Sequence, residues 1–222
     1  FIFSPRVIIT HIFLKIYDIM KERGGVMKVI FGGAFNPVTN AHMQVYEYVM
    51  NKVGADEFVF LPVSNAYTKS DLASNFHRLN MLELAISDKD KVKVSELEMN
   101  DSDFLGTYQS LIRFSDSEQV DVGFVIGADN LMGMHLWINI EGILSEFKII
   151  VLSRYGIDID KVIDGNPILK KHKNSFIICE DFNMDISSTH FRETFKKEFV
   201  PDKVYQYIID NGLYKVDDDD RI

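Results

Sequence analysis

The chain has 222 residues, a formal net charge of −9 at pH 7 and a hydrophobic fraction of 46%. This length suits one sizeable α/β domain, and the acidic balance without a basic block argues against wholesale nucleic-acid binding, although a local pocket for a nucleotide-sized anion stays open. The single cysteine, Cys179, excludes an internal disulfide and a cysteine-rich zinc site, and it fits a reducing cytoplasm.

Residues 1–26 are set apart as an extension. Apolar residues at positions 9, 12, 13, 16 and 20 fit an added amphipathic helix, but charged residues interrupt the stretch before it reaches the ~18–20 apolar residues of a membrane span. We favour a second interpretation. Purine-rich codons, like those of a ribosome-binding site, can encode Lys21–Gly25, so we expect translation to start at Met27 and residues 1–26 to be non-native.

From Met27 onward the sequence predicts alternating strands and helices. The predicted strands are 28–31, 57–62, 91–95, 121–126, 148–152 and 175–179. The predicted helices are 41–53, 75–86, 104–114, 131–145 with a break near Leu136-Trp137, 188–197 and 201–211. We therefore predict an α/β fold with a Rossmann-like, doubly wound, mostly parallel sheet and helices on both faces. We expect it to form a single domain over residues 27–216, followed by an acidic tail over residues 217–222.

Ligands bind beyond the carboxyl ends of the strands in such a sheet, and polar segments follow the strands here. The first is Gly32–His42 (GGAFNPVTNAH), a tight loop that ends in a helix start and suits a phosphate. It contains neither a G-x-G-x-x-G nor a Gly-Lys-Ser/Thr pattern. On spacing alone, the loop is equally well an ordinary strand-end turn, with His42 a residue of the helix start.

Two segments resemble the signatures of the nucleotidyltransferase superfamily of adenylyl- and cytidylyltransferases. Gly32–His42 resembles T/H-x-G-H, with Ala41 where glycine is usual, and Asp185–Arg192 (DISSTHFR) resembles I-S-S-T-x-x-R. The chain is further similar to nicotinamide/nicotinate mononucleotide adenylyltransferases over residues 27–216. The segments that carry this similarity are Leu61–Lys69, His77-Arg78, Gly127–Asp129, Leu136-Trp137, Ser153-Arg154 and Tyr207–Tyr214.

The resemblance implies an adenylyltransferase that transfers AMP from ATP to nicotinate or nicotinamide mononucleotide in NAD biosynthesis and releases pyrophosphate. The acceptor phosphate is already an anion, so the reaction needs positioning and charge neutralisation rather than a general base. Two alternatives remain open at this point. One is pantetheine-phosphate adenylyltransferase, which shares both signatures, and the other is a non-catalytic nucleotide-sensing module of the same fold.

The resemblance also implies roles for single residues. The expected catalytic residues are His42, as a donor to the α-phosphate, Thr39, whose hydroxyl replaces the first signature histidine, and Arg192. The expected ATP-binding residues are Gly32, Gly33, Ala34, Phe35, Lys69, Gly127, Asp129, Ser187, Ser188 and Thr189. The expected mononucleotide-binding residues are Arg78, Thr107, Trp137 and Arg154, with Trp137 stacking on the pyridine ring.

Each role has a plainer alternative. Ser187–Thr189 and Asp129 are also suited to cap helices, and Trp137 to fill the core. Lys69 also reads as a solvated loop residue, and Arg78 and Arg154 as members of surface ion pairs.

The histidines show no metal-ligand spacing, so we expect no metal site built from protein side chains. Mg²⁺ is expected to be held mainly through the ATP phosphates. The expected partners are ATP and a pyridine mononucleotide, without nucleic acid or membrane. The superfamily often forms dimers or larger assemblies, which leaves a homo-oligomer open.

Overall fold

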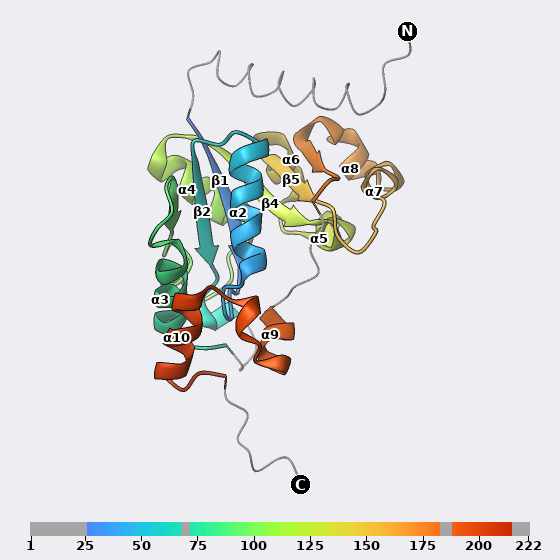
Figure 1. Ribbon diagram of the computed structural model, residues 1–222. Coiled ribbons are helices and arrows are strands. Elements are labelled where there is room, and N and C mark those ends of the chain that lie inside the picture. Colours follow the sequence, from blue (N-terminus) through green and yellow to red (C-terminus); the bar gives the residue numbers. More distant parts are fainter. Residues whose placement is uncertain (1–25, 68–71, 183–187, 215–222) are drawn as a thin grey trace.

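The protein is built on one parallel sheet, which the computed structural model describes within residues 26–67, 72–182 and 188–214 (Figure 1). The sheet has six strands in the order β3-β2-β1-β4-β5-β6, and every neighbouring pair is parallel. The strands are β1 (Met27–Gly33), β2 (Glu57–Pro62), β3 (Val92–Val94), β4 (Asp121–Gly127), β5 (Lys148–Leu152) and β6 (Phe176–Cys179). The predicted doubly wound sheet is confirmed.

Helices cover both faces of the sheet. The α-helices are α2 (Asn40–Lys52), α3 (Asn75–Ile86), α4 (Thr107–Glu118), α5 (Ala128–Gly133), α6 (Ile140–Glu146), α7 (Ile159–Gly165), α8 (Pro167–Lys171), α9 (Ser188–Thr194) and α10 (Asp202–Asp210). Short 3-10 turns are η1 (Asn65–Tyr67), η2 (Met134–Leu136), η3 (Lys173–Ser175) and η4 (Lys197–Phe199). Within the described ranges, every helix falls short of the length and apolar character that a membrane crossing requires.

The strands bury both of their faces, which explains their near-continuous apolar sequences. In β1, Val29 packs into a core with α2, α3, α9 and α10, whereas Ile30 packs into a second core with α4 to α8. The pairs Phe58/Val59 and Phe60/Leu61 of β2 alternate in the same way. Figure 1 shows the resulting arrangement, with α2 lying across one face and α9 and α10 beyond the ends of β1 and β2.

Most predicted elements are found, and the differences lie in the bounds of helices and in two additional helices. Helix α4 begins at Thr107 rather than at 104, because its N-cap residue Gly106 has a φ of 88°, which ends the preceding loop. The predicted break in helix 131–145 is found as η2 between α5 and α6. Helices α7 and α8 were not predicted, although the side chains of Asp158 and Asn166 cap them.

Candidate active site

The candidate site lies where the strand order reverses. β1 and β4 are neighbours in the sheet, but the chain continues from β1 to β2 on one side and from β4 to β5 on the other. The carboxyl ends of β1 and β4 therefore border an open crevice. The loop after β1, the start of α5 after β4 and the residues after β5 all meet at this edge. The fold therefore brings together segments that are up to about 150 residues apart in the chain.

His42 is held in one orientation at the start of α2. The backbone N–H of Thr39 donates a hydrogen bond to His42 Nδ1 at 2.9 Å, and Thr39 Oγ1 lies 3.0 Å from the same nitrogen. Because Nδ1 accepts from a backbone N–H, the neutral ring carries its proton on Nε2. Phe35 packs edge-on against the ring with 5.1 Å between centroids, which fixes the plane in which Nε2–H points.

His42 stays neutral at physiological pH. Burial lowers its pKa to about 4, and the positive charge of Arg154 contributes to the lowering. The imidazole can therefore serve as a neutral hydrogen-bond donor through Nε2, and it does not need to lose a proton first.

Thr39 lies behind His42 rather than at the crevice. Its side chain is fully buried, and its hydroxyl faces His42 Nδ1. Phe35 is likewise buried, with a φ of 47°, so only its backbone is available to a phosphate. Both residues were expected to meet the ligand directly, but in this structure they shape the loop that would do so.

The two signature segments are joined by hydrogen bonds. Ser188 Oγ donates to the Pro37 carbonyl at 2.8 Å, and Arg192 Nη1 donates to the Asn36 carbonyl at 2.6 Å. Arg192 Nη2 also lies 3.2 Å from Thr189 Oγ1, on the exposed side of α9. The start of α9 thus forms a second wall against the loop that follows β1.

Asn36 connects this loop to Tyr214 in the C-terminal segment, and its role was not foreseen. Its side-chain Oδ1 accepts hydrogen bonds from the Tyr214 hydroxyl at 2.8 Å and from the Ala73 N–H at 3.0 Å. Tyr214 belongs to the C-terminal segment that carried part of the family resemblance, which was the one signal in the sequence for this contact. The loop after β1 is therefore held by hydrogen bonds from α9, from Tyr214 and from the backbone of Ala73.

Arg78 does not reach the crevice. It is fully buried, and no carboxylate among the described residues pairs with it. Its guanidinium instead donates to five oxygens at 2.6–3.1 Å, which are Ala34 O, Val63 O, Ala73 O, Asn65 Oδ1 and Asn75 Oδ1. It therefore links the loops after β1 and β2 to α3, and neither mononucleotide binding nor a surface ion pair describes this arrangement.

Gly127, Asp129 and Arg154 form the opposite side of the crevice. The exposed Asp129 carboxylate lies 3.7 Å from Arg154 Nη1, and Arg154 also covers the Tyr155 ring at 4.5 Å. Arg154 Nε is buried without a hydrogen-bond partner among the described residues. A Cβ atom at Gly127 would overlap the Asp129 carboxylate, so glycine is needed to leave that side chain in place.

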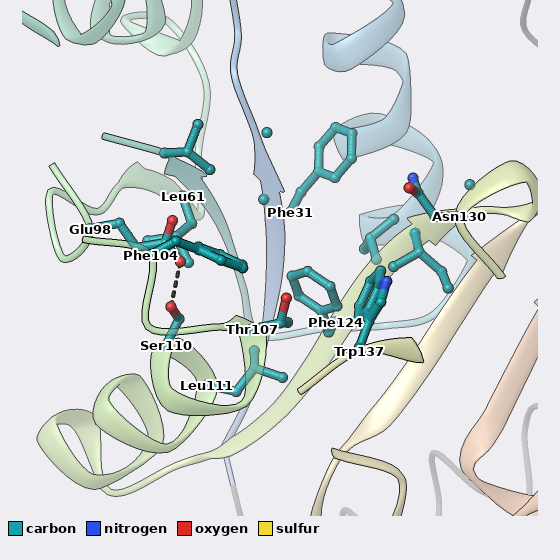
Figure 2. Close-up of a pocket in the computed structure, with 16 residues that line it drawn as sticks. Phe31, Leu61, Glu98, Phe104, Thr107, Ser110, Leu111, Phe124, Asn130 and Trp137 are labelled. Atoms are coloured by element: carbon teal, nitrogen blue, oxygen red, sulfur yellow. Dashed lines mark hydrogen bonds between the residues drawn. The ribbon is translucent and has the colours of Figure 1, made fainter. Parts of the chain in front are cut away.

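A pocket opens between β1 and β4 beside this crevice, and we call it the β1–β4 pocket. Figure 2 shows Trp137, Phe124 and Asn130 on one side of it, Glu98 and Ser110 on the other, and Thr107 between them. Trp137 is half-buried, and its ring lies at 71° to the ring of Phe124 with 6.3 Å between the centroids. Trp137 and Thr107 were both predicted to bind the acceptor, and the structure brings them into one pocket.

Glu98 and Ser110 of this pocket were missed. Glu98 is 5% exposed, and its carboxylate is hydrogen-bonded to the Ser110 hydroxyl. Burial raises the Glu98 pKa above its ordinary value. Glutamate is almost always exposed, and no periodicity surrounds Glu98, so no sequence pattern indicates its burial.

Two predicted ATP-binding residues, Lys69 and Ser187, lie outside the described residues, as do the extension up to residue 25 and the acidic tail. Gly32, Gly33 and Gly127 line the β1–β4 pocket. Within residues 26–67, 72–182 and 188–214, no three His, Cys, Asp or Glu side chains cluster as metal ligands would.

The chain matches known proteins along most of its length. A family model described as cytidylyltransferase-like covers residues 30–194. A probable nicotinate-nucleotide adenylyltransferase of Clostridium acetobutylicum is 35% identical over 196 residues, which are 84% of this chain and 98% of that protein. The corresponding protein of Clostridium tetani is 32% identical over 197 residues, covering 85% of this chain and 98% of its own length.

The fold is also found among solved structures. The Plasmodium falciparum nicotinic acid mononucleotide adenylyltransferase complexed with NaAD aligns with a TM-score of 0.66 at 24% identity. The alignment covers 85% of this chain and 97% of that enzyme. At this identity the likeness shows the shared fold.

Proposed function

The chain belongs to the cytidylyltransferase-like family, and from this premise we propose how it acts as an adenylyltransferase of NAD biosynthesis. It transfers AMP from ATP to nicotinate or nicotinamide mononucleotide and releases pyrophosphate. The observation that carries the proposal is the hydrogen-bonded contact of the two signature segments beside an aromatic pocket. The contact between the two signature segments suits a triphosphate, and the aromatic pocket beside it suits a flat ring.

The chemical step is an in-line displacement at the α-phosphorus of ATP. An oxygen of the acceptor phosphate forms the new P–O bond as the bond to the pyrophosphate leaving group breaks. Nε2–H of His42 donates to the α-phosphate oxygen on which charge builds up, while the Thr39 N–H keeps the donor tautomer in place. Thr39 acts on the reaction through His42.

Charge on the leaving pyrophosphate is neutralised from α9. We assign the β- and γ-phosphates to Arg192, Thr189 and Ser188, with Ser187 and Lys69 as further contacts. Ser188 would contribute its backbone N–H, because its hydroxyl donates to the Pro37 carbonyl. The Arg192 guanidinium is already fixed by the Asn36 carbonyl, so little side-chain freedom is lost on binding. We also assign backbone N–H groups of Gly32–Phe35 to the phosphate chain.

The acceptor lies in the β1–β4 pocket. Trp137 covers the face of the pyridine ring, and Thr107 at the start of α4 is placed for the ring substituent. We assign the acceptor phosphate to the partly exposed guanidinium of Arg154. Asp129 is placed for a ribose hydroxyl of ATP.

Mg²⁺ fits this site as an ion that enters with the nucleotide. The described part of the crevice supplies cations, hydroxyls and backbone N–H groups rather than a carboxylate cage, so the triphosphate and water would provide the oxygen ligands that Mg²⁺ prefers. When bound, the ion would neutralise phosphate charge. The described residues would orient the phosphates around it.

The test measures pyrophosphate release with ATP and each of three acceptors: nicotinate mononucleotide, nicotinamide mononucleotide and pantetheine phosphate. We expect turnover with at least one pyridine mononucleotide and a large loss in His42→Ala. Turnover with pantetheine phosphate alone, or ATP binding without turnover, would reject the proposal. The cytoplasm, where ATP is available, is the proposed location.

A further inference from the structure

We propose that Glu98 is a specificity-determining residue of the β1–β4 pocket, whose carboxyl group discriminates between a carboxylate and a carboxamide on the acceptor ring. This inference rests on the proposed function and asks which of the two pyridine mononucleotides the pocket prefers. It assigns that choice to a residue that neither signature contains.

Position is the first observation. Glu98 lines the same pocket as Trp137 and Thr107, and Figure 2 shows it on the side opposite Trp137. Among the sixteen described residues that line the pocket, it is the one with an ionisable side chain. The remainder of the lining is aliphatic, aromatic, glycine or neutral polar, so a charge on Glu98 meets little screening.

The charges around Glu98 are the second observation. Asp101 raises its pKa and Arg113 lowers it, but Arg113 is already paired with Asp101 at 2.7 Å and therefore does not neutralise Glu98 directly. The neutral Ser110 hydroxyl donates a hydrogen bond to the carboxylate, which lowers the Glu98 pKa in part. Burial has the largest effect and raises the Glu98 pKa, so the carboxyl titrates nearer to neutral pH than an exposed glutamate does.

The consequence differs for the two acceptors. A nicotinate ring carries a carboxylate at neutral pH, and an ionised Glu98 in the same pocket repels it. A nicotinamide ring carries an uncharged amide, whose N–H groups are compatible with a carboxylate. Protonation of Glu98 therefore raises the preference of the pocket for nicotinate mononucleotide over nicotinamide mononucleotide, and ionisation of Glu98 lowers this preference.

The experiment measures kcat/KM for both acceptors between pH 5.5 and 9 and uses their ratio. Effects on ATP binding, His42 or the acceptor phosphate act on both substrates and cancel in this ratio. In the wild type we expect the preference for nicotinate over nicotinamide to fall by about tenfold as pH rises. In Glu98→Gln the ratio should be independent of pH and remain at the low-pH value of the wild type.

Glu96→Gln is the matched control, because it makes the same change two residues away at an exposed position outside the pocket. It should reproduce the wild-type curve. A merely structural role of Glu98 would lower kcat/KM for both acceptors alike and leave the ratio and its pH dependence unchanged, which would overturn the inference. Glu98→Leu is a second variant without the charge and keeps the test decisive if Glu98→Gln folds poorly. A nicotinate-to-nicotinamide ratio that equals the wild-type ratio at every pH in both variants overturns the inference. Absence of turnover with either pyridine mononucleotide would reject the proposed function itself.

Discussion

At the scale of single residues, the chemistry depends on a hydrogen bond behind the catalytic side chain. The Thr39 N–H fixes the proton of His42 on Nε2, and this donor belongs to the backbone. Substitution of the Thr39 side chain therefore leaves the tautomer intact. His42→Ala, in contrast, removes the donor to the developing charge.

We expect His42→Ala to lower kcat by about 10²–10³, the usual cost of one preorganised donor. Thr39→Val should lower kcat by less than about tenfold, because the backbone donor to Nδ1 remains. Steady-state kinetics with saturating ATP measure both. Equal losses in the two variants would show that the Thr39 hydroxyl contacts the substrate after all.

The low pKa of His42 also predicts a pH dependence of stability. The folded protein has a His42 pKa of about 4, whereas an unperturbed histidine titrates near 6.5. Between these values the unfolded chain binds more protons, so the free energy of unfolding falls as pH drops from about 6.5 to 4. Urea unfolding should show that His42→Gln loses less stability over this window than the wild type, by on the order of 3 kcal/mol. Parallel curves would contradict the assigned pKa.

Gly127 gives a residue-scale prediction on the other side of the crevice. In Gly127→Ala the new methyl group displaces the Asp129 carboxylate and separates it from Arg154. We expect a rise of about tenfold in KM for ATP, with a melting temperature within a few degrees of the wild type. Gly133→Ala, where a Cβ meets nothing within 4 Å, is the control and should leave KM unchanged.

At the scale of elements, Arg78 holds together the loops on which the site is built. Its five acceptors belong to the loops after β1 and β2 and to the start of α3. Arg78→Met leaves three of these five part-buried oxygens without a hydrogen-bond donor among the described residues, because Asn65 still donates to the other two. We expect a loss of about 3 kcal/mol or more in the free energy of unfolding. Arg113→Met is the comparison, because Arg113 is partly exposed and its partners can turn to water. A smaller loss for Arg78→Met than for Arg113→Met would refute the linking role.

The elements show what the sequence could and could not predict. Strands such as β2 were predicted because burial on both faces leaves a nearly unbroken apolar run. Helices α7 and α8 are short and were missed, since five to seven residues carry too little periodicity to stand out. The structure brings the two signature segments into contact. The buried positions of Arg78, Asn36 and Glu98 could not be predicted. Polar residue types normally indicate exposure, and only tertiary contacts show otherwise.

At the scale of the whole molecule, the crevice exists because β1 and β4 lie side by side at the centre of the sheet. β1, β4 and β5 can lie this close together only if the side chains packed between them leave enough space. Gly123 of β4 supplies that space, because a Cβ there would lie 3.2 Å from Ile150 Cδ1 in β5 and 3.4 Å from Val29 Cγ2 in β1.

Gly123→Ala therefore tests whether the central strands are packed as tightly as the site requires. Both neighbours are buried β-branched side chains with little freedom to move, so we expect the variant to lose about 1–3 kcal/mol of unfolding free energy. Gly165→Ala makes the same change at the end of α7, where nothing lies within 4 Å of the new atom, and should be neutral or slightly stabilising. If the strands also set the width of the crevice, Gly123→Ala will raise KM for both substrates while Gly165→Ala will not. A Gly123→Ala protein as stable as Gly165→Ala would mean that the sheet adjusts freely at its centre, and the crevice could then not depend on this packing.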